Sequence, residues 1–324
     1  MANDEGQHIA LIMTVLNERG SIDNLLESIA NQTRLPDQLV VTDAGSTDGT
    51  VEALRAWNPP DGLLLSLMVR PGVSISEGRN LSISEAKCEI IAVTDVGTSF
   101  GPRWLEDITR AIVDRKADVV GGFFEPGGSR PFQRFLGAVT TPLLNEIQPD
   151  QFLPSSRSIA FTKHAWASVG GYPEWLDYCE DLVFDLDLKA NGAVFAFAPS
   201  AVVAWDARPG LTAFFRQYYR YARGDGKASL WPKRHLVRYA SYFGGAVLLV
   251  AAQRHPIWYG VLLVGGVAYM SRYVRRLAAR WEDLDSGVRR LAPALPLVMV
   301  AGDVAKMAGY GVGITWRRRG RGSL

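Results

Sequence analysis

The sequence predicts an α/β fold in which a mostly parallel sheet is flanked by helices. Short apolar runs, typical of buried strands, alternate with segments whose apolar residues fall at helical spacing. Such alternation is the pattern of parallel strands joined by crossover helices. Acidic residues and glycines follow the strands directly, and sheets of this kind bind ligands beyond the carboxyl ends of their strands.

Each element of this pattern follows from the residues. The expected strands are residues 9–15, 38–42, 63–69 and 89–94. The expected helices are residues 21–32, 50–57 and 77–86. The first helix places Ile22, Leu25, Leu26 and Ile29 at helical spacing, and the fourth strand runs directly into Asp95. The residues that end these strands are the first candidates for a functional site.

Charge divides the chain into two regions of different character. Residues 207–324 hold 20 basic and 5 acidic residues, a net charge of +15, whereas residues 1–206 hold 15 and 28, a net charge of −13. The basic part also contains the long apolar runs, so contact with an anionic membrane is favoured over binding to nucleic acid. We therefore expect an α/β domain over residues 1–230 and a basic, membrane-associated helical region over residues 231–324.

Three apolar runs occupy the basic region, at residues 239–252, 257–273 and 291–316. The first two are shorter than the roughly 20 residues of a standard span, so a membrane hairpin and a pair of interfacial helices both stay open, beside a soluble helical domain. The third contains Asp303 and Lys306, which can pair on one helix face. If this third run spanned the membrane, basic segments would lie on both sides of it, although basic residues are usually concentrated on the cytoplasmic side. A re-entrant or interfacial third segment is therefore also considered.

The start of the chain and the cysteines suggest a cytoplasmic location for the first domain. Met1–Gly6 is short and acidic, and a strand-like run follows, so no secretory signal is recognised. Cys88 and Cys179 lie far apart without zinc-site spacing and form no disulfide framework. Motifs of kinases, dehydrogenases, serine hydrolases and zinc proteases are absent from the sequence.

Polar residues gather where the first two strands end, in Thr14–Glu18 and Asp43–Thr50. The Asp43 carboxylate could accept hydrogen bonds from the N–H of a base, and Glu18 could accept them from ribose hydroxyls. Gly45 and Gly49 would let the backbone approach such a ligand closely. Ordinary turn and helix-capping chemistry is the alternative interpretation of the same residues.

Taken together, these segments, Arg79-Asn80 and the strand that leads to Asp95 resemble the family 2 glycosyltransferases with a GT-A fold. The similarity covers residues 8 to about 225 and rests on the ordered set of motifs. In that family they form the pocket for a nucleotide-diphosphate sugar. The resemblance therefore implies donor-binding roles for Thr14, Asn17, Glu18, Asp43, Arg79, Asn80 and Asp95.

Asp95 lies where the family has the first acid of its DxD motif, which grips the donor diphosphate through a divalent cation. Mg²⁺ and Mn²⁺ prefer oxygen ligands, and two adjacent phosphates need neutralisation. This chain reads Asp95-Val96-Gly97, so the second acid is missing. A metal, if bound, is held with one carboxylate fewer or with help from cationic side chains.

Glu180-Asp181 opens a predicted helix and matches the family's ED motif, in which the Asp is the catalytic base. An acceptor hydroxyl loses its proton as it attacks the anomeric carbon, and a carboxylate within hydrogen-bond reach can take it. The helix N-terminus would favour ionised Asp181. Tyr178, just before the motif, is expected to contact the acceptor. A helix-capping acid pair is the alternative.

Gln217-Tyr218-Tyr219-Arg220-Tyr221 resembles the QxxRW motif of processive members, with Tyr221 in place of Trp. Gln217 and Arg220 are expected to bind the donor diphosphate, and Tyr221 to stack on an acceptor sugar. An amphipathic interfacial helix is the alternative, because Arg216, Arg220 and Arg223 recur at helical spacing. Arg157 lies where family members line the donor pocket and is expected to contact phosphate.

The resemblance implies an inverting glycosyltransferase at the cell membrane, with its catalytic domain, residues 1–230, on the cytoplasmic side. Its expected partners are a nucleotide-diphosphate sugar, a glycan or lipid-linked acceptor, and the membrane. Two other functions stay open. A sugar nucleotidyltransferase would need a Gly-rich basic loop where this chain has Asn17-Glu18-Arg19-Gly20. A non-catalytic membrane scaffold is favoured by the missing second acid and disfavoured by Glu180-Asp181.

Overall fold

A computed structural model describes residues 8–320, so Met1–Gly6 and the last residues of the basic segment Trp316–Gly322 lie outside the described part. The chain forms two compact units. The first contains the described residues up to Glu125 together with Leu143–Trp205, and the second contains Pro126–Pro142 and the residues from Asp206 onward. The units thus divide the chain at other positions than the expected boundary at residue 230.

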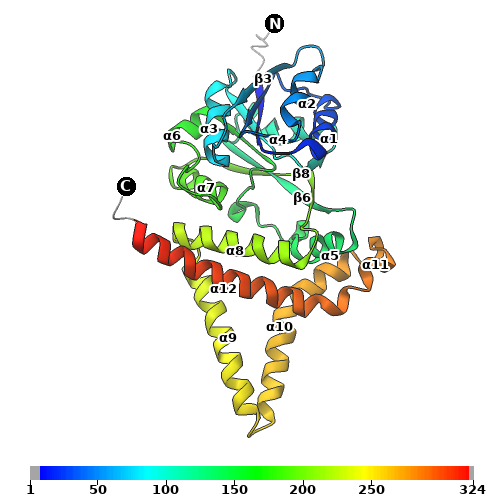
Figure 1. Ribbon diagram of the computed structural model, residues 1–324, viewed down its shortest axis with the longest axis vertical. Coiled ribbons are helices and arrows are strands. Elements are labelled where there is room, and N and C mark those ends of the chain that lie inside the picture. The colour runs from blue at the N-terminus through cyan, green and yellow to red at the C-terminus, as the bar shows by residue number, and fades with distance from the viewer. Residues whose placement is uncertain (1–7, 321–324) are drawn as a thin grey trace. The chain divides into compact units, whose positions relative to one another are not determined.

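The first half of the sheet is parallel, as expected. Strands β1 (Ile9–Val15), β2 (Gln38–Asp43), β3 (Leu64–Val69) and β4 (Ile90–Val93) lie in the order β3-β2-β1-β4. Helices α1 (Arg19–Ala30), α2 (Thr50–Ala56) and α3 (Ile75–Glu85) connect them (Figure 1). All of these elements end within two residues of their predicted bounds. The register pairs Val15 with Asp43, which brings the ends of β1 and β2 together.

The sheet becomes mixed after Asp95. Its other strands are β5 (Thr98–Phe100), β6 (Val119–Gly127), β7 (Ile159–Thr162) and β8 (Phe195–Asp206), and the full order is β3-β2-β1-β4-β7-β6-β8-β5. Strand β7 runs antiparallel to both β4 and β6, and β5 runs antiparallel to β8. The α/β fold class is confirmed, but the sheet also contains the antiparallel pairs β4–β7, β7–β6 and β5–β8.

Helices cover both faces of this sheet, and β1 is apolar on both faces apart from Thr14. Alternate residues of a strand point to opposite faces. Leu11 and Met13 pack in the cluster that contains α1 and α4 (Trp104–Val113), whereas Ile12 packs in the cluster of α3, α6 (Lys163–Ser168) and α7 (Glu180–Ala190). Two short 3-10 turns, Leu144–Glu146 and Pro149–Gln151, precede β7.

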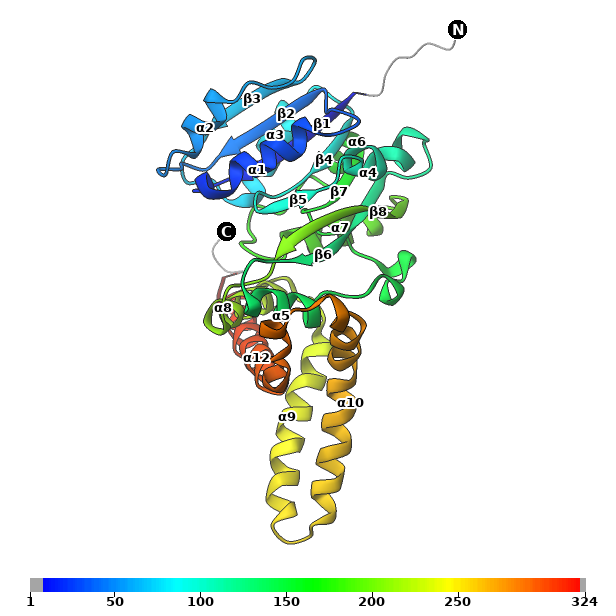
Figure 2. The ribbon, with the colours of Figure 1, turned by 90° about the vertical axis from the view of Figure 1, so that its right-hand side faces the viewer.

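The second unit is helical. It consists of α5 (Pro131–Thr140), α8 (Leu211–Ala228), α9 (Pro232–Ala252), α10 (Ile257–Ala279), α11 (Ser286–Arg289), α12 (Leu295–Gly320) and the 3-10 turns Trp281–Asp283 and Ala292–Ala294. Helices α9 and α10 form a hairpin, and α8 and α12 lie side by side across its base (Figures 1 and 2). The core packs Phe135, Phe214, Leu277 and Val298 together.

Glycines bring the backbones of α8 and α12 into direct contact. A methyl group at Gly309 would lie 2.1 Å from the carbonyl oxygen of Tyr219, and one at Gly313 would lie 2.2 Å from that of Arg223. Only a residue without a side chain allows helices to approach this closely. The contact of α8 with α12 therefore depends on Gly309 and Gly313.

Replacing Gly309 with Ala should destabilise the second unit, because the added methyl group overlaps the α8 backbone. Overpacking of this kind costs about 1–3 kcal/mol. Gly311→Ala is the matched control on the same helix, since its methyl group would meet only Tyr239 Oη at 3.7 Å. Thermal unfolding of the detergent-solubilised protein measures both, and equal melting temperatures for the two variants would contradict the close contact.

Candidate active site

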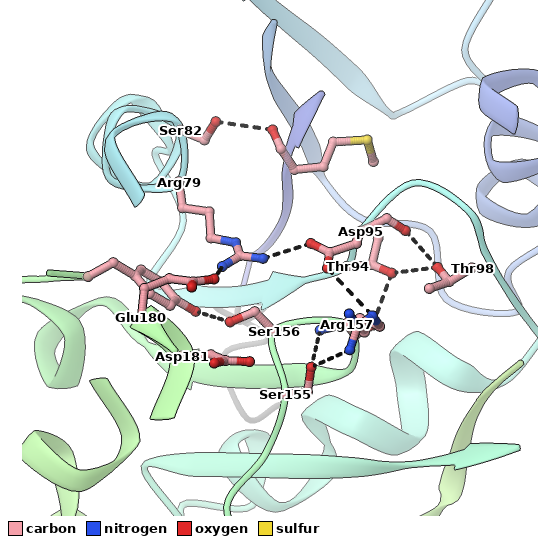
Figure 3. A network of polar contacts seen from close by, with 12 residues as sticks. Arg79, Ser82, Thr94, Asp95, Thr98, Ser155, Ser156, Arg157, Glu180 and Asp181 are labelled. Atoms are coloured by element: carbon pink, nitrogen blue, oxygen red, sulfur yellow. Dashed lines mark hydrogen bonds and ion pairs between the residues drawn. The ribbon is translucent and has the colours of Figure 1, made fainter. Parts of the chain in front are cut away.

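A buried arginine joins two acids that are far apart in the sequence. Arg79, on α3, is 2% exposed and donates from Nη2 to Asp95 Oδ1 (2.7 Å) and from Nη1 to Glu180 Oε1 (2.8 Å) (Figure 3). Asp95 follows β4, and Glu180 is the first residue of α7. The guanidinium therefore links the end of a central strand to the start of the helix that carries the predicted base.

Local interactions hold α3, which carries Arg79, and the turn at Asp95 in place. Ser74 caps α3, because its hydroxyl accepts a hydrogen bond from the Glu77 backbone N–H while its own backbone N–H donates to the Glu77 carboxylate. Gly78 lets α3 approach β1, since a methyl group there would lie 2.4 Å from Thr14 Cγ2. After Asp95 the chain turns sharply, and the Thr98 hydroxyl donates to the Asp95 carbonyl oxygen at 2.7 Å.

The two acids at the start of α7 have different surroundings. Glu180 is buried, and this burial, together with repulsion from Asp181, raises its pKa to about 7, although Arg79 opposes the shift. Asp181 is half-buried, and its Oδ1 accepts a hydrogen bond from the Leu182 backbone N–H at 2.9 Å. Glu180 is thus engaged with Arg79, whereas Asp181 is the more accessible acid of the pair.

Arg157 approaches the other side of Asp95. Its Nε lies 3.9 Å from Asp95 Oδ2, and its Nη1 donates to Ser155 Oγ at 3.2 Å. The guanidinium carbon is 4.7 Å from the centre of the Trp205 ring, within the range of a cation–π contact. Two cationic side chains therefore flank Asp95. Sequence reasoning missed Trp205, whose only signal was its position near the end of a strand.

The two loops predicted to bind the donor are tied to each other. The Asn17 backbone N–H donates to Ser46 Oγ at 2.8 Å, and Asn17 Oδ1 accepts from the Thr47 backbone N–H at 2.9 Å. The Glu18 backbone N–H donates to Thr50 Oγ1 at 2.9 Å. The loops after β1 and β2 therefore form one surface at the carboxyl ends of these strands.

Asp43 and Thr14 each carry a buried oxygen that no described residue satisfies. Asp43 Oδ1 accepts from the backbone N–H groups of Gly45 and Ser46, but Asp43 Oδ2 has no hydrogen-bond partner among residues 8–320. Thr14 Oγ1 is likewise unpartnered there. Unpaired buried polar atoms are costly and are often found at functional sites.

Asn80, also predicted to bind the donor, is occupied by protein groups. Its Nδ2 donates to the Tyr172 carbonyl oxygen and to Glu174, and its Oδ1 accepts from the Tyr172 backbone N–H and Trp166 Nε1. All four hydrogen bonds of the amide are therefore made within the protein. This geometry assigns Asn80 to holding the segment before α7.

Asp185 is a second acid that sequence reasoning missed. It lies one turn after Asp181 on α7 and is 1% exposed, and both of its carboxylate oxygens lack a partner among the described residues. Burial, together with repulsion from Asp181, raises its pKa well above the usual range. The only sequence signal was a charged residue on the apolar face of the predicted helix.

Four predicted residues remain, one in the first unit and three in the second. Tyr178 is half-buried in the segment before α7. Gln217, Arg220 and Tyr221 lie on α8 in the second unit, where Gln217 Nε2 donates to Tyr221 Oη at 2.8 Å. Gln217 is buried and Arg220 is exposed. The first and last residues of the QxxRW-like motif thus bind each other.

A divalent cation fits this site only in part. No group of three or more His, Cys, Asp or Glu side chains among residues 8–320 could hold a metal by itself. Asp95 offers one carboxylate, and Gly97, where a second acid would stand, is exposed with φ +84°. Mg²⁺ is often held by one or two carboxylates together with substrate phosphates. The residues therefore suit a cation that the donor diphosphate helps to bind.

Replacing Arg79 with Gln should destabilise the first unit by about 3–5 kcal/mol at pH 8, since Asp95 and Glu180 lose the buried charge that pairs them. The raised Glu180 pKa gives the sign of the pH effect. Its protonated form is favoured in the folded state, so stability is lost as pH rises through about 7. Without Arg79 this pKa should rise further, and the variant should lose less at pH 5.5 than at pH 8.

Chemical denaturation at both pH values measures this difference. Arg110→Gln is the control, because Arg110 is 52% exposed and pairs with Glu106 on the surface, where an ion pair contributes about 0–1 kcal/mol. Equal losses for Arg79→Gln at the two pH values would mean that Glu180 does not titrate as described.

Comparison with known proteins identifies the family. The sequence model of the family "Glycosyl transferase family 2" matches residues 10–169, and that of "Glycosyl transferase family group 2" matches residues 90–301. The succinoglycan biosynthesis protein ExoA of Rhizobium meliloti (strain 1021) is 25% identical over 227 residues, which cover 67% of this chain and 68% of that protein. A validoxylamine A glucosyltransferase of Streptomyces hygroscopicus subsp. limoneus is 28% identical over 111 residues, 32% of this chain and 24% of the relative.

A solved structure shares the fold. The mannosyltransferase PcManGT of Pyrobaculum calidifontis, determined with GDP-Man and Mn²⁺, superposes with a TM-score of 0.56 at 18% identity and covers 96% of this chain and 87% of its own. The GT-A fold is thereby confirmed. The family matches and the relatives confirm the expectation of a transferase. The chain belongs to the family 2 group of glycosyltransferases.

Proposed function

We propose that this glycosyltransferase moves a sugar, with inversion, from a nucleotide-diphosphate sugar to a lipid-linked or envelope glycan acceptor. One observation supports this most strongly. Arg79 holds Asp95, at the end of a central strand, and Glu180, at the start of α7, in a single buried ion-pair cluster. Asp181 follows Glu180, so the more accessible acid is carried by the helix that this cluster joins to Asp95.

In the proposed reaction Asp181 acts as the general base. Its carboxylate takes the proton of the acceptor hydroxyl while the hydroxyl oxygen forms a bond to the anomeric carbon of the sugar. The bond from that carbon to the diphosphate oxygen breaks on the opposite side, and the nucleoside diphosphate leaves with the electron pair. Attack and departure on opposite faces invert the anomeric configuration.

The donor would lie over the loops that follow β1 and β2. The free oxygen of Asp43 and the hydroxyl of Thr14 are the unsatisfied polar atoms there, and Asp43 suits the N–H of a base. Arg157, held over Trp205, would contact the diphosphate. Asp95 would hold a Mg²⁺ or Mn²⁺ ion together with the phosphates, and such an ion would neutralise charge on the leaving group.

The proposed acceptor and the proposed location are inferred from the helices and the charge of the second unit. Two helical segments among the described residues are long and apolar enough to cross a membrane, Pro232–Ala252 and Ser286–Gly320. Together with the charge of residues 207–324, this supports a place at the cell membrane with the catalytic unit on the cytoplasmic side. An acceptor attached to lipid or to the envelope follows from that place.

Nucleotide release from UDP-, GDP- and dTDP-sugars by the detergent-solubilised protein tests the proposed function. We expect slow hydrolysis of one donor that a chelator suppresses and Mg²⁺ or Mn²⁺ restores. Release from no donor, together with no donor binding by calorimetry, would favour the non-catalytic scaffold.

Replacing Asp181 with Asn should lower turnover by roughly 10²–10⁴-fold, because the base is lost, while donor affinity stays unchanged. Steady-state kinetics and calorimetry of donor binding measure the two effects separately. Asp187→Asn is the matched control, an exposed acid on the same helix, and should keep full activity. A variant lacking Asp181 that turns over normally would assign the base to another residue.

Replacing Gly97 with Asp should tighten Mn²⁺ binding in the presence of a nucleoside diphosphate by about tenfold or more, because a second carboxylate enters the site. Gly97 has φ +84° and no atom within 4 Å of an added Cβ, and Asp tolerates this conformation better than most residues. Gly97→Asn controls for shape without charge. Electron paramagnetic resonance of Mn²⁺ reads binding directly, and equal affinity for both variants would argue against Asp95 as the metal ligand.

A further inference from the structure

The hairpin of α9 and α10 is apolar on all sides. Phe243 and Val250 on α9 are 75% and 73% exposed, and Ile257 and Val264 on α10 are 72% and 70% exposed. A helix on the surface of a soluble protein keeps a polar face toward water. Neither helix has one between Phe243 and Ala268, so this part of the hairpin is suited to an apolar surrounding.

Both ends of the apolar part carry residues typical of a membrane interface. The tip contains Gln253-Arg254-His255-Pro256 followed by Trp258 and Tyr259, and the base contains Tyr239, Tyr242 and Tyr269. Trp and Tyr are enriched at the boundaries of the bilayer. From Tyr239 to Ala252 the helix rises about 21 Å, somewhat less than the roughly 30 Å of the hydrocarbon core.

Helix α12 also has the length and composition of a span, but its place in the second unit differs. It runs crosswise to the hairpin at its base (Figures 1 and 2). The crossing is held by Asp303, which is 4% exposed and accepts hydrogen bonds from Arg238 Nε (3.0 Å), Tyr242 Oη (3.3 Å) and Tyr269 Oη (2.5 Å). Lys306 pairs with it at 3.3 Å, as the sequence predicts.

This arrangement allows only one of the two candidates to stand along the membrane normal. Asp303 receives donors from α9 and α10 at once, so turning α12 into line with the hairpin would break a buried charge network. Removing the partners of a buried charge is strongly unfavourable. If the hairpin enters the membrane, α12 lies across it.

The exposed face of α12 suits such a position. Leu297, Val300, Val304, Val312 and Trp316 are 39–64% exposed and recur at helical spacing, with the exposed Ala308 between them. The face toward α8 is built instead from Gly302, Ala305, Gly309 and Gly313. A helix with one apolar stripe open to its surroundings is typical of a segment that lies in the plane of a bilayer surface.

We propose that the α9–α10 hairpin is the only bilayer-inserted element among the described residues and that α12 lies along the membrane surface at its base. The partner is a bilayer with anionic headgroups. Exposed basic residues stand next to the hairpin base to meet them, namely Lys233 and Arg234 before it and Arg272 and Arg275 after it. The inference rests on the membrane location proposed above, but not on the identity of donor or acceptor.

This topology keeps the basic segments on one side. The chain enters the hairpin after Lys233-Arg234 and leaves it before Arg272, so both flanks and α12 share the side from which the hairpin inserts. Only Arg254, among Lys and Arg residues, lies at the tip. The bias of basic residues toward the cytoplasm is thereby satisfied, whereas a spanning α12 would violate it.

Depth-dependent fluorescence quenching tests the topology. Single cysteines at Val247 in α9, Val304 in α12 and Glu52 in α2 would carry an environment-sensitive dye in protein reconstituted into phosphatidylcholine–phosphatidylglycerol vesicles. Cys88 and Cys179 are buried, and wild-type protein treated in the same way gives the background. We expect quenching at Val247 by lipids labelled deep in the acyl chain, quenching at Val304 by shallow labels only, and none at Glu52.

Two results would overturn the proposal: deep quenching at Val304 equal to that at Val247, which would make α12 a span, or no quenching at Val247. A charge variant tests the anionic partner independently. Arg272→Glu with Arg275→Glu should weaken flotation with anionic vesicles by more than tenfold and leave neutral vesicles unaffected. Equal flotation of variant and wild type would reject that part. Nucleotide release by the same proteins shows separately whether the catalytic proposal holds.

Discussion

The buried ion-pair cluster of Arg79 is the constraint on which the catalytic unit depends. A guanidinium that is 2% exposed has little access to water, so it depends on the two acidic side chains that accept its hydrogen bonds. Those side chains belong to Asp95 and Glu180, which are 85 positions apart in the sequence. The cluster therefore forms only when the strand end and the start of α7 have reached their final positions. Asp181 is positioned as a result, because it follows Glu180 on the first turn of α7.

The same cluster also balances the negative charge of the Asp95 carboxylate. Asp95 is shared with Arg79 on one oxygen and approached by Arg157 on the other, so its charge is largely balanced before any ligand arrives. The absent second acid at Gly97 fits this balance, since another carboxylate would add negative charge where the proposed diphosphate would bind. In the proposed mechanism, neutralisation of the donor would fall to cationic side chains to a greater extent than in a site with two acids.

A second buried charge network organises the helical unit by the same physics. The Asp303 carboxylate accepts hydrogen bonds from side chains on α9, α10 and α12. A different angle between α12 and the hairpin would break these bonds and leave a buried charge without partners. Close glycine contacts then fix α12 against α8. A rigid unit of this kind can present an apolar hairpin and an apolar stripe on α12 to one membrane.

Local sequence alone determined the elements of the α/β half, because the spacing of apolar residues and the turn residues act over a few positions. The strands up to Asp95 and the helix at Glu180 therefore lie where they were predicted. Tertiary structure alone decided how separated residues meet. The antiparallel strands after β4, the pairing of Arg79 with Asp95 and Glu180, and the full use of Asn80 depend on contacts between distant segments. The apolar composition of α12 resembles that of α9, because hydropathy indicates how well a helix suits lipid but not how the helix is oriented. Only the packing around Asp303 distinguishes the orientations of the two helices.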